Sequence, residues 1–175
     1  MKINLGAGPN WKHEGWHILD HKIEKNENFK IKGNLNSINL KKKSCDLVFI
    51  SHTLEHIPHI QIQNVLTEIN RIMKTGATIR ILVPNLEVVA KAYVKKDKAF
   101  FKKAIDEDHS IRRDLGFGGM FMNFMVSPGQ DTVLLDRDLK KFIAGYAHLY
   151  AYDFDMMKIL LKKCGFKNIK KKKFS

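Results

Sequence analysis

Small and polar residues follow four apolar runs in the first third of the chain, and their types suit a nucleoside-like ligand. Gly6 and Gly8 come directly after the first run, and Asp20 ends the second. Because glycine has no Cβ and tolerates positive φ, such a turn lets a ligand lie against bare backbone. A carboxylate suits the two hydroxyls of a ribose, and an amide such as that of Asn34 can pair with an adenine edge. The candidate ligand-binding residues are Asn4, Gly6, Ala7, Gly8, Asp20, His21, Asn34, Leu35, Ser51 and His52.

The elements that must position these residues alternate between strand and helix patterns, which is typical of an α/β fold. Strands are expected at residues 3–5, 16–20, 29–33, 46–51, 78–83 and 166–169. Helices are expected from about residue 60 to 74, where apolar residues recur at helical spacing, and from Asp153 to Gly165. In a doubly wound, Rossmann-like, mostly parallel sheet, ligands bind beyond the carboxyl ends of the strands. The candidate residues should therefore converge at one edge of the sheet.

Length and composition predict a single domain over residues 1–175, because 175 residues with 44% hydrophobic content can bury one sizeable core. Residues 86–147 are expected as a less regular insert or lid region. Within it, residues 115–125 are rich in glycine, methionine and phenylalanine. This run fits either a loop with core anchors or a flexible apolar lid over a substrate site.

The spacing of the first two candidate groups favours S-adenosylmethionine over a dinucleotide. The third glycine of the dinucleotide pattern is absent, since Trp11 stands in its place. Asp20 follows Gly8 so closely that residues 9–15 are too few for a crossover helix. A dinucleotide needs the N-terminus of that helix for its pyrophosphate, whereas S-adenosylmethionine carries no phosphate. The shortened first crossover therefore disfavours a dinucleotide.

Several segments together resemble the class I S-adenosylmethionine-dependent methyltransferases, in particular their small type 11 branch. Residues 2–8 look like its glycine motif, residues 15–20 like its GWxNxD strand and residues 46–56 like its DxIxxsHvLEH segment. Residues 71–76 are similar to its RxLKPGG motif, and residues 148–166 to its late helix ending in aGF. The resemblance implies a Rossmann-like fold, S-adenosylmethionine as cofactor and methyl transfer to an acceptor.

Three features depart from the pattern of that family. Asn4 stands where an acidic residue is common, and Asn34 stands where many members carry an aspartate. An amide can still form a hydrogen bond at both positions. The chain also stops around the expected sixth strand, so the usual final antiparallel strand can be missing.

Methyl transfer from a sulfonium needs no nucleophilic residue, because holding the acceptor in line supplies much of the acceleration. A general base helps a hydroxyl or protonated amine, and His52 and His148 are the catalytic candidates. The expected acceptor is a small molecule. An alternative is a non-catalytic domain that binds S-adenosylmethionine or RNA.

A remote alternative is a zinc peptidase, because residues 52–56 match the HxxEH motif. That motif needs an uninterrupted helix that presents both histidines. A buried strand runs directly into His52, and Pro58 disfavours helix at Ile57. No metal site is therefore expected from the sequence.

The net charge of +13 raises the question of nucleic-acid binding, but only five of the 31 basic residues are arginine. Because bidentate contacts with phosphates and bases favour arginine, the lysine excess predicts solvated faces and no nucleic-acid partner. No membrane span or signal-peptide pattern is present, so we expect a cytoplasmic protein without a membrane partner. Cys45 and Cys164 lack metal-binding spacing and are expected as buried thiols, with a single disulfide as the alternative. The oligomeric state is left open.

Overall fold

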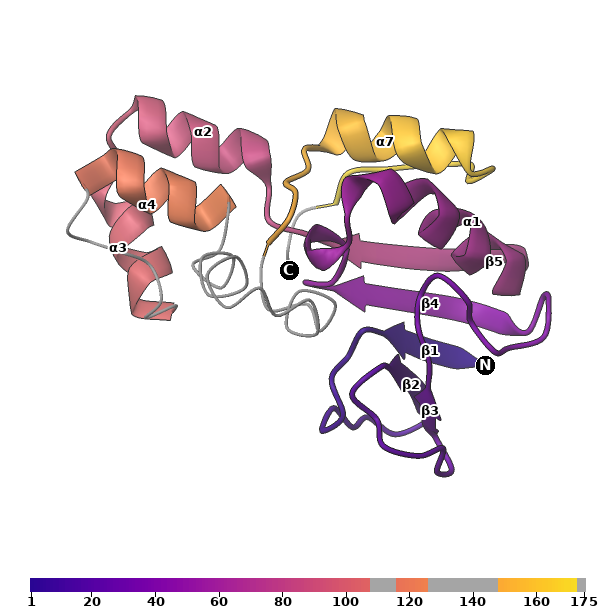
Figure 1. The fold of residues 1–175 in the computed structure, drawn as a ribbon. Helices are drawn as coiled ribbons and strands as arrows, with labels where there is room; N and C mark the ends of the chain where they lie inside the picture. The colour runs from indigo at the N-terminus through magenta and orange to yellow at the C-terminus, as the bar shows by residue number, and fades with distance from the viewer. Residues whose placement is uncertain (108–115, 126–147, 173–175) are drawn as a thin grey trace. The chain divides into compact units, whose positions relative to one another are not determined.

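The computed structural model describes residues 1–107, 116–125 and 148–172. The chain divides into two compact units, which we call the sheet unit and the helical unit. The sheet unit comprises Met1–Leu54, Pro58–Val83 and Phe154–Ser175, and the helical unit comprises Glu55–Ile57 and Pro84–Asp153. Figure 1 labels their helices and strands. The expectation of a single domain over residues 1–175 stays a prediction.

The sheet unit is built on five parallel strands in the order β3-β2-β1-β4-β5. The strands are β1 (Lys2–Leu5), β2 (Trp16–Asp20), β3 (Lys30–Lys32), β4 (Cys45–Ser51) and β5 (Met73–Leu82). The strand order changes direction between β1 and β4, which is where a doubly wound sheet offers its ligand site. The predicted α/β, Rossmann-like, mostly parallel sheet is therefore confirmed, with no helix between β1 and β2.

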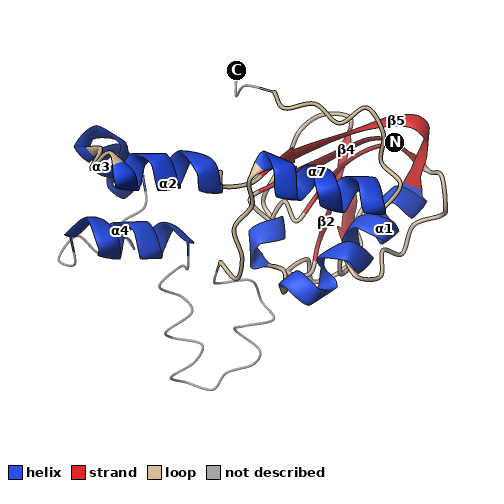
Figure 2. Cartoon of the chain, turned by 90° about the horizontal axis from the view of Figure 1, so that it is seen from above, coloured by secondary structure: helices blue, strands red, loops and turns tan. Residues whose placement is uncertain are grey.

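One face of this sheet is covered by α1 (Ile62–Ile72) and α7 (Phe154–Lys163), which lie side by side in Figure 2. The apolar residues of α1 recur every three or four positions, so one stripe of the helix turns into the core. All six apolar residues that this spacing placed in the core are buried. They are Ile62, Val65, Leu66, Ile69, Ile72 and Met73. The predicted late helix ends as expected at Gly165, which has φ +85° and follows α7.

Aromatic residues cover part of the sheet where the first crossover has no helix. Register places Trp16 beside Lys2 and Phe49 beside Asn4, and the Trp16 and Phe49 rings meet edge to face at 6.4 Å. Trp11, from the short crossover, packs edge to face on Trp16 at 6.0 Å. These aromatic rings therefore cover a part of the sheet that a crossover helix would otherwise cover.

An arginine on α1 holds the connection between β3 and β4. Arg71 donates from Nε to Glu68 Oε2 at 2.7 Å, and from its two terminal nitrogens to the carbonyls of Leu40 (3.0 Å) and Ile38 (2.8 Å). Glu68 Oε1 also accepts from the Ile38 amide at 2.8 Å. Hydrogen bonds from Arg71 are the main cause that lowers the pKa of Glu68. The arginine of the RxLKPGG-like motif thus fixes a loop to a helix.

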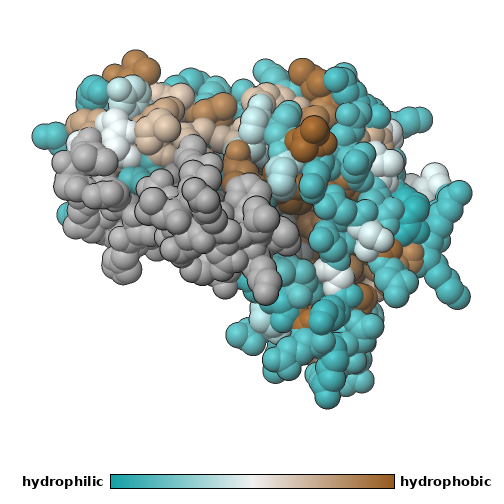
Figure 3. All heavy atoms as spheres, viewed as in Figure 1, coloured by the Kyte–Doolittle hydropathy of each residue, from teal (hydrophilic) through white to brown (hydrophobic). Residues whose placement is uncertain are grey.

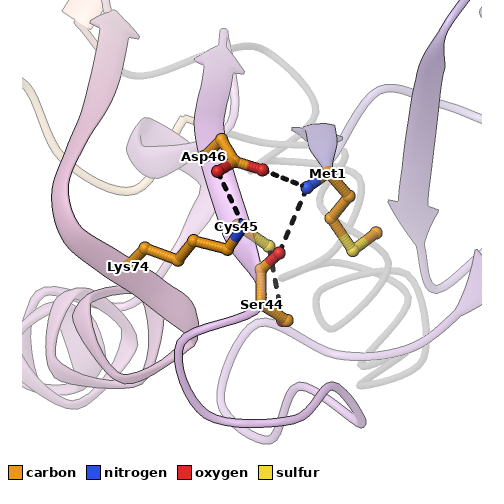
Figure 4. A network of polar contacts seen from close by, with 5 residues as sticks. All are labelled: Met1, Ser44, Cys45, Asp46 and Lys74. Carbon is orange, nitrogen blue, oxygen red and sulfur yellow. Dashed lines mark hydrogen bonds and ion pairs between the residues drawn. The ribbon is translucent and has the colours of Figure 1, made fainter.

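Figure 4 shows a second polar network, at the start of β4. The Met1 ammonium donates to the Ser44 carbonyl at 3.1 Å and to Asp46 Oδ2 at 2.5 Å, and Lys74 donates to Asp46 Oδ1 at 2.8 Å. The hydrogen bond from Lys74, followed by that from the terminal amine, lowers the pKa of Asp46 from 3.8 to about 2. The network joins β1, β4 and β5 at one end of the sheet.

The helical unit contains α2 (Leu86–Val94), α3 (Lys98–Glu107) and α4 (Gly116–Met125). The apolar run at residues 115–125 was expected as a loop with core anchors or as a flexible lid. Its described part, α4, is an α-helix, so the loop is wrong, while a lid role stays a prediction. Two ring contacts stabilise this helix despite its glycines: Tyr93 with Phe121 at 4.9 Å, and Phe101 with Phe117 at 5.8 Å. Packing of this kind overrides the low helix propensity of glycine.

The strand expected at residues 166–169 is wrong, because no described residue after α7 belongs to a strand. Asn168 has φ +55°, which interrupts extended backbone. Lys167, which precedes it, and Lys170, two positions later, are exposed. Among the described residues, the sheet therefore ends at β5, and no final antiparallel strand is present.

Candidate functional site

The turn after β1 is held against β4 by one side chain that the sequence analysis did not single out. Gly6 has φ +72°, and a Cβ built on it would lie 2.3 Å from Thr53 Cγ2 and 2.6 Å from Thr53 Oγ1. The Thr53 hydroxyl donates to the Ser51 carbonyl at 3.0 Å. The Gly6 amide donates to the Leu19 carbonyl at 2.8 Å. Gly6 is therefore required by close packing, and Thr53 is the residue that imposes it.

The second glycine of the turn faces open space and contacts the acidic residue predicted to bind ribose. Gly8 has φ +75°, and a Cβ built on it would meet no atom of the described residues within 4 Å, its two chain neighbours apart. Its amide donates to Asp20 Oδ2 at 2.8 Å, while Asp20 Oδ1 accepts from the Lys22 amide at 2.8 Å. The structure thus brings together Gly8 and Asp20, and the space beside Gly8 admits a ligand next to bare backbone.

Asp20 is buried, with a relative exposure of 6%. His21 Nδ1 lies 3.6 Å from Asp20 Oδ1, and the His21 side chain is exposed. A carboxylate has about four acceptor positions, so the amide bonds from Gly8 and Lys22 leave acceptor capacity. Asp20 can therefore hold the turn after β1 against β2 and still accept a hydrogen bond from a ligand hydroxyl.

The amide-bearing turn expected near adenine follows β3. Asn34 is exposed, and its Oδ1 accepts from the Asn36 amide at 3.1 Å. The Gly33 amide donates to the Asp20 carbonyl at 3.3 Å, which sets this turn beside the end of β2. Leu35 is buried. The turn and Asp20 are therefore adjacent, although no described contact joins the Asn34 side chain to Gly8 or Asp20.

Asn4 lies within β1 and is 3% exposed. Its Oδ1 is buried and accepts no hydrogen bond from any residue that the structure describes. Ala7, in the turn, is half-buried. Because a buried polar atom without a partner is costly, Asn4 Oδ1 marks a position where a hydrogen bond from a ligand or water would be favourable.

The fourth group of candidate residues, Ser51 and His52, lies at the end of β4. Ser51 is half-buried, and His52 is exposed with φ +50°. The His52 amide donates to the Leu82 carbonyl at 3.0 Å, which closes the pairing of β4 with β5. His52 therefore sits at the expected strand end, in a backbone conformation that turns the chain sharply.

The second catalytic candidate belongs to the helical unit. His148 is half-buried, and its Nδ1 lies 3.3 Å from the Phe124 carbonyl. Its ring meets that of His56 at a centroid distance of 4.9 Å. Burial is the main cause that raises the pKa of Tyr152, and the charges of Tyr150 and Glu55 add to it. The Glu55 carboxylate therefore lies close to the Tyr152 phenol. His148 thus belongs to a cluster of titratable groups.

The HxxEH match lacks the helix that a zinc peptidase needs. After β4, residues Leu54–His56 form a single 3-10 turn, and α1 begins only at Ile62. His52 precedes that turn and has positive φ. The two histidines of the motif therefore do not lie on one α-helix.

The residues at the ends of β1 and β2 fit S-adenosylmethionine. The open side of Gly8, the acceptor capacity of Asp20 and the buried Oδ1 of Asn4 offer clearance and hydrogen bonds in one region of the sheet unit. None of the described helices begins in the turn after β1, so this turn supplies no helix N-terminus for a pyrophosphate. The chemistry of this donor set therefore favours a ligand without phosphate.

Surface properties add little to the choice of ligand. Most of the described face seen in Figure 3 is hydrophilic, with smaller apolar patches between. None of the described helices is long and apolar enough to cross a membrane. Both cysteines are buried free thiols, as expected.

Comparison with known proteins agrees with this geometry. Residues 16–81, which run from β2 to β5, match the methyltransferase domain family of type 11. A search of curated proteins finds no significant match.

Solved structures of S-adenosylmethionine-dependent methyltransferases share the fold. One from Archaeoglobus fulgidus aligns over 97% of this chain with 17% identity and a TM-score of 0.53. One from Thermotoga maritima, described as a possible histamine N-methyltransferase, aligns over 95% with 14% identity and a TM-score of 0.51. One from Mesorhizobium loti aligns over 95% with 11% identity and a TM-score of 0.51, and 74% of that chain is covered.

The chain spans 62% and 64% of the length of the Archaeoglobus and Thermotoga structures. The family match and the shared fold imply S-adenosylmethionine as the cofactor. The resemblance is thus confirmed at the level of the fold, which the described chain shares with S-adenosylmethionine-dependent methyltransferases, and residues 16–81 match the methyltransferase domain family of type 11.

Proposed function

We propose that this protein transfers a methyl group from S-adenosylmethionine to a small organic acceptor. The observation that carries the proposal is the pairing of Gly8 with Asp20, at the carboxyl ends of two neighbouring parallel strands. The open space beside Gly8 would take the methionine part of the cofactor, as its bare backbone permits close approach. Methyl transfer is supported by the family match over residues 16–81, which includes Asp20 and begins after the glycine turn.

Each candidate residue has a distinct role in this proposal. Asp20 would accept hydrogen bonds from the ribose hydroxyls, and the turn with Asn34 and Leu35 would flank the adenine. Asn4 would accept a hydrogen bond near the methionine end through its buried Oδ1. The remaining candidates would line the site by their backbone or exposed side chains. They are Gly6, Ala7, His21, Ser51 and His52.

When bound, S-adenosylmethionine supplies a methyl group already activated by a sulfonium. The chain has to hold the acceptor atom in line with that group and exclude competing water. For a hydroxyl or protonated amine, a base must also take a proton. His52, which is exposed at the end of β4, is one candidate base. His148 is the other, and its Nε2 can take a proton only in a chain that has no cation bound to that atom.

A transfer assay tests the proposal. The protein is incubated with methyl-labelled S-adenosylmethionine and a cell extract, and small molecules, RNA and protein are then counted separately. We expect enzyme-dependent label in the small-molecule fraction, and a loss of that label with Gly8→Ala.

Other distributions of label would support other functions. Label in RNA alone would replace the small-molecule acceptor with a nucleic acid. Binding of S-adenosylmethionine with no transfer to any fraction would favour the non-catalytic domain. The proposal requires label that appears in small molecules and depends on an intact cofactor site.

A further inference from the structure

Three metal-ligating side chains meet in the helical unit, although they come from distant parts of the sequence. Glu55 and His56 belong to the 3-10 turn Leu54–His56, and His148 lies just before the segment that leads into α7. Each offers one ligand atom, and the three atoms all lie within 4.8 Å of one another. The sequence motif pairs His56 with His52, whereas the fold pairs it with His148.

Main-chain hydrogen bonds hold these two segments together. The Glu55 carbonyl accepts from the Leu149 amide at 2.7 Å and from the Tyr150 amide at 3.2 Å. The His56 and His148 rings contact each other at a centroid distance of 4.9 Å. Backbone hydrogen bonds therefore fix the position of the cluster, and the meeting of its side chains does not depend on the rotamers of exposed residues.

The tautomer of His148 suits a metal ligand. With Nδ1–H donating to the Phe124 carbonyl at 3.3 Å, the lone pair of Nε2 is available for a cation. Ligating histidines commonly donate their other ring nitrogen to a carbonyl, which fixes the ring orientation. This contact supplies that arrangement at His148.

The carboxylate of the cluster is buried, since Glu55 is 1% exposed. His56 and His148 are half-buried. A divalent cation would place positive charge beside a carboxylate that has been removed from water, which offsets its desolvation. Two imidazoles and one carboxylate form a donor set that suits Zn²⁺, while Mg²⁺ and Ca²⁺ prefer oxygen ligands.

We propose that Glu55, His56 and His148 form a binding site for a single Zn²⁺ ion. Bonds of about 2.1 Å to one tetrahedral ion hold two donor atoms about 3.4 Å apart. The ligand atoms, which all lie within 4.8 Å of one another, would therefore draw together by up to about 1.4 Å on binding. Three protein ligands leave a fourth position for water or another molecule. The ion would tie residues 55–56 to residue 148.

The test uses the full, untagged chain, freed of metal with a chelator, and Zn²⁺ alone as the probe. Calorimetric titration should give one Zn²⁺ per chain. Glu55→Gln keeps the shape of the side chain and the main-chain bonds, and we expect it to weaken Zn²⁺ binding about tenfold or more. We expect at least the same loss with His148→Ala. The matched control, His13→Ala, removes an exposed histidine outside the cluster and should leave binding unchanged.

A spectroscopic measurement on the unmodified chain covers the case in which a variant fails to fold. X-ray absorption of the Zn²⁺-loaded protein should show two imidazoles and no sulfur ligand. The proposal is overturned by an absence of stoichiometric binding, by equal affinity in Glu55→Gln and the control, or by a sulfur ligand. Because S-adenosylmethionine takes no part in these measurements, their outcome is independent of the proposed methyl transfer.

Discussion

Replacing Gly6 by alanine should destabilise the fold far more than the same change at Gly8. Both glycines have similar positive φ, +72° and +75°, so both variants bear the cost of a left-handed alanine, about 1–2 kcal/mol. Only at Gly6 does the new Cβ clash, 2.3 Å from Thr53 Cγ2 and 2.6 Å from its Oγ1. Overpacking of this kind adds about 1–3 kcal/mol, so Gly6→Ala should cost about 2–5 kcal/mol in total.

Urea denaturation of the two variants measures this difference in the free energy of unfolding. We expect the midpoint of Gly6→Ala to lie well below that of Gly8→Ala, with similar slopes. A double variant, Gly6→Ala with Thr53→Ala, removes the clashing Cγ2 and Oγ1 atoms. It should recover about 1–3 kcal/mol relative to the sum of the single variants. Equal stability of Gly6→Ala and Gly8→Ala, or strict additivity of the double variant, would refute the close-packing role of Thr53.

Three further changes probe the supports of the sheet unit. Arg71→Lys loses the paired bonds to Glu68 and to the Ile38 and Leu40 carbonyls, and should lower the free energy of unfolding by about 1–2 kcal/mol in urea; no change would show that the clamp contributes little. The pKa of Asp46 is depressed from 3.8 to about 2, so its stabilisation of the fold is present above pH 3.8 and is lost as the pH falls toward 2. In thermal melts, the melting temperature of Asp46→Asn should therefore fall less over that pH range than that of the unmodified chain. Identical pH profiles would contradict this. Gly165→Ala places a Cβ on a residue with φ +85°, 2.9 Å from Asn70 Nδ2, which donates to the Cys164 carbonyl. This change should lower the free energy of unfolding by about 1–2 kcal/mol in the same urea assay. An unchanged free energy would argue against a tightly packed end of α7.

The parts of the fold that follow from local patterns were predicted correctly. Val48 and Ile50 lie in a nearly continuous apolar run, and both are fully buried in β4. The apolar stripe of α1 was recognised from its spacing alone. The brevity of the chain between Gly8 and Asp20 also predicted a first crossover without a helix. In each case the residues that decide the structure are close together in the sequence.

The features that were missed depend on contacts between distant residues or on a single backbone angle. Thr53 packs against Gly6, which lies 47 positions earlier, and nothing in either local sequence marks this approach. The helix α4 forms in a glycine-rich run because Phe117 and Phe121 pack on rings from other helices. The positive φ of Asn168 interrupts the expected last strand. The meeting of His148 with His56 likewise required the fold.

The account depends most on the assignment of the turn after β1 to S-adenosylmethionine. Calorimetric titration of the full chain with S-adenosylmethionine and S-adenosylhomocysteine tests it directly, with Gly8→Ala as the comparison. That variant fills the open space with a methyl group and should weaken binding about tenfold or more, while it unfolds as a single cooperative transition. We predict binding of both compounds to the unmodified chain and this loss in the variant. Binding of neither compound, or equal affinity in the two proteins, would contradict the assignment.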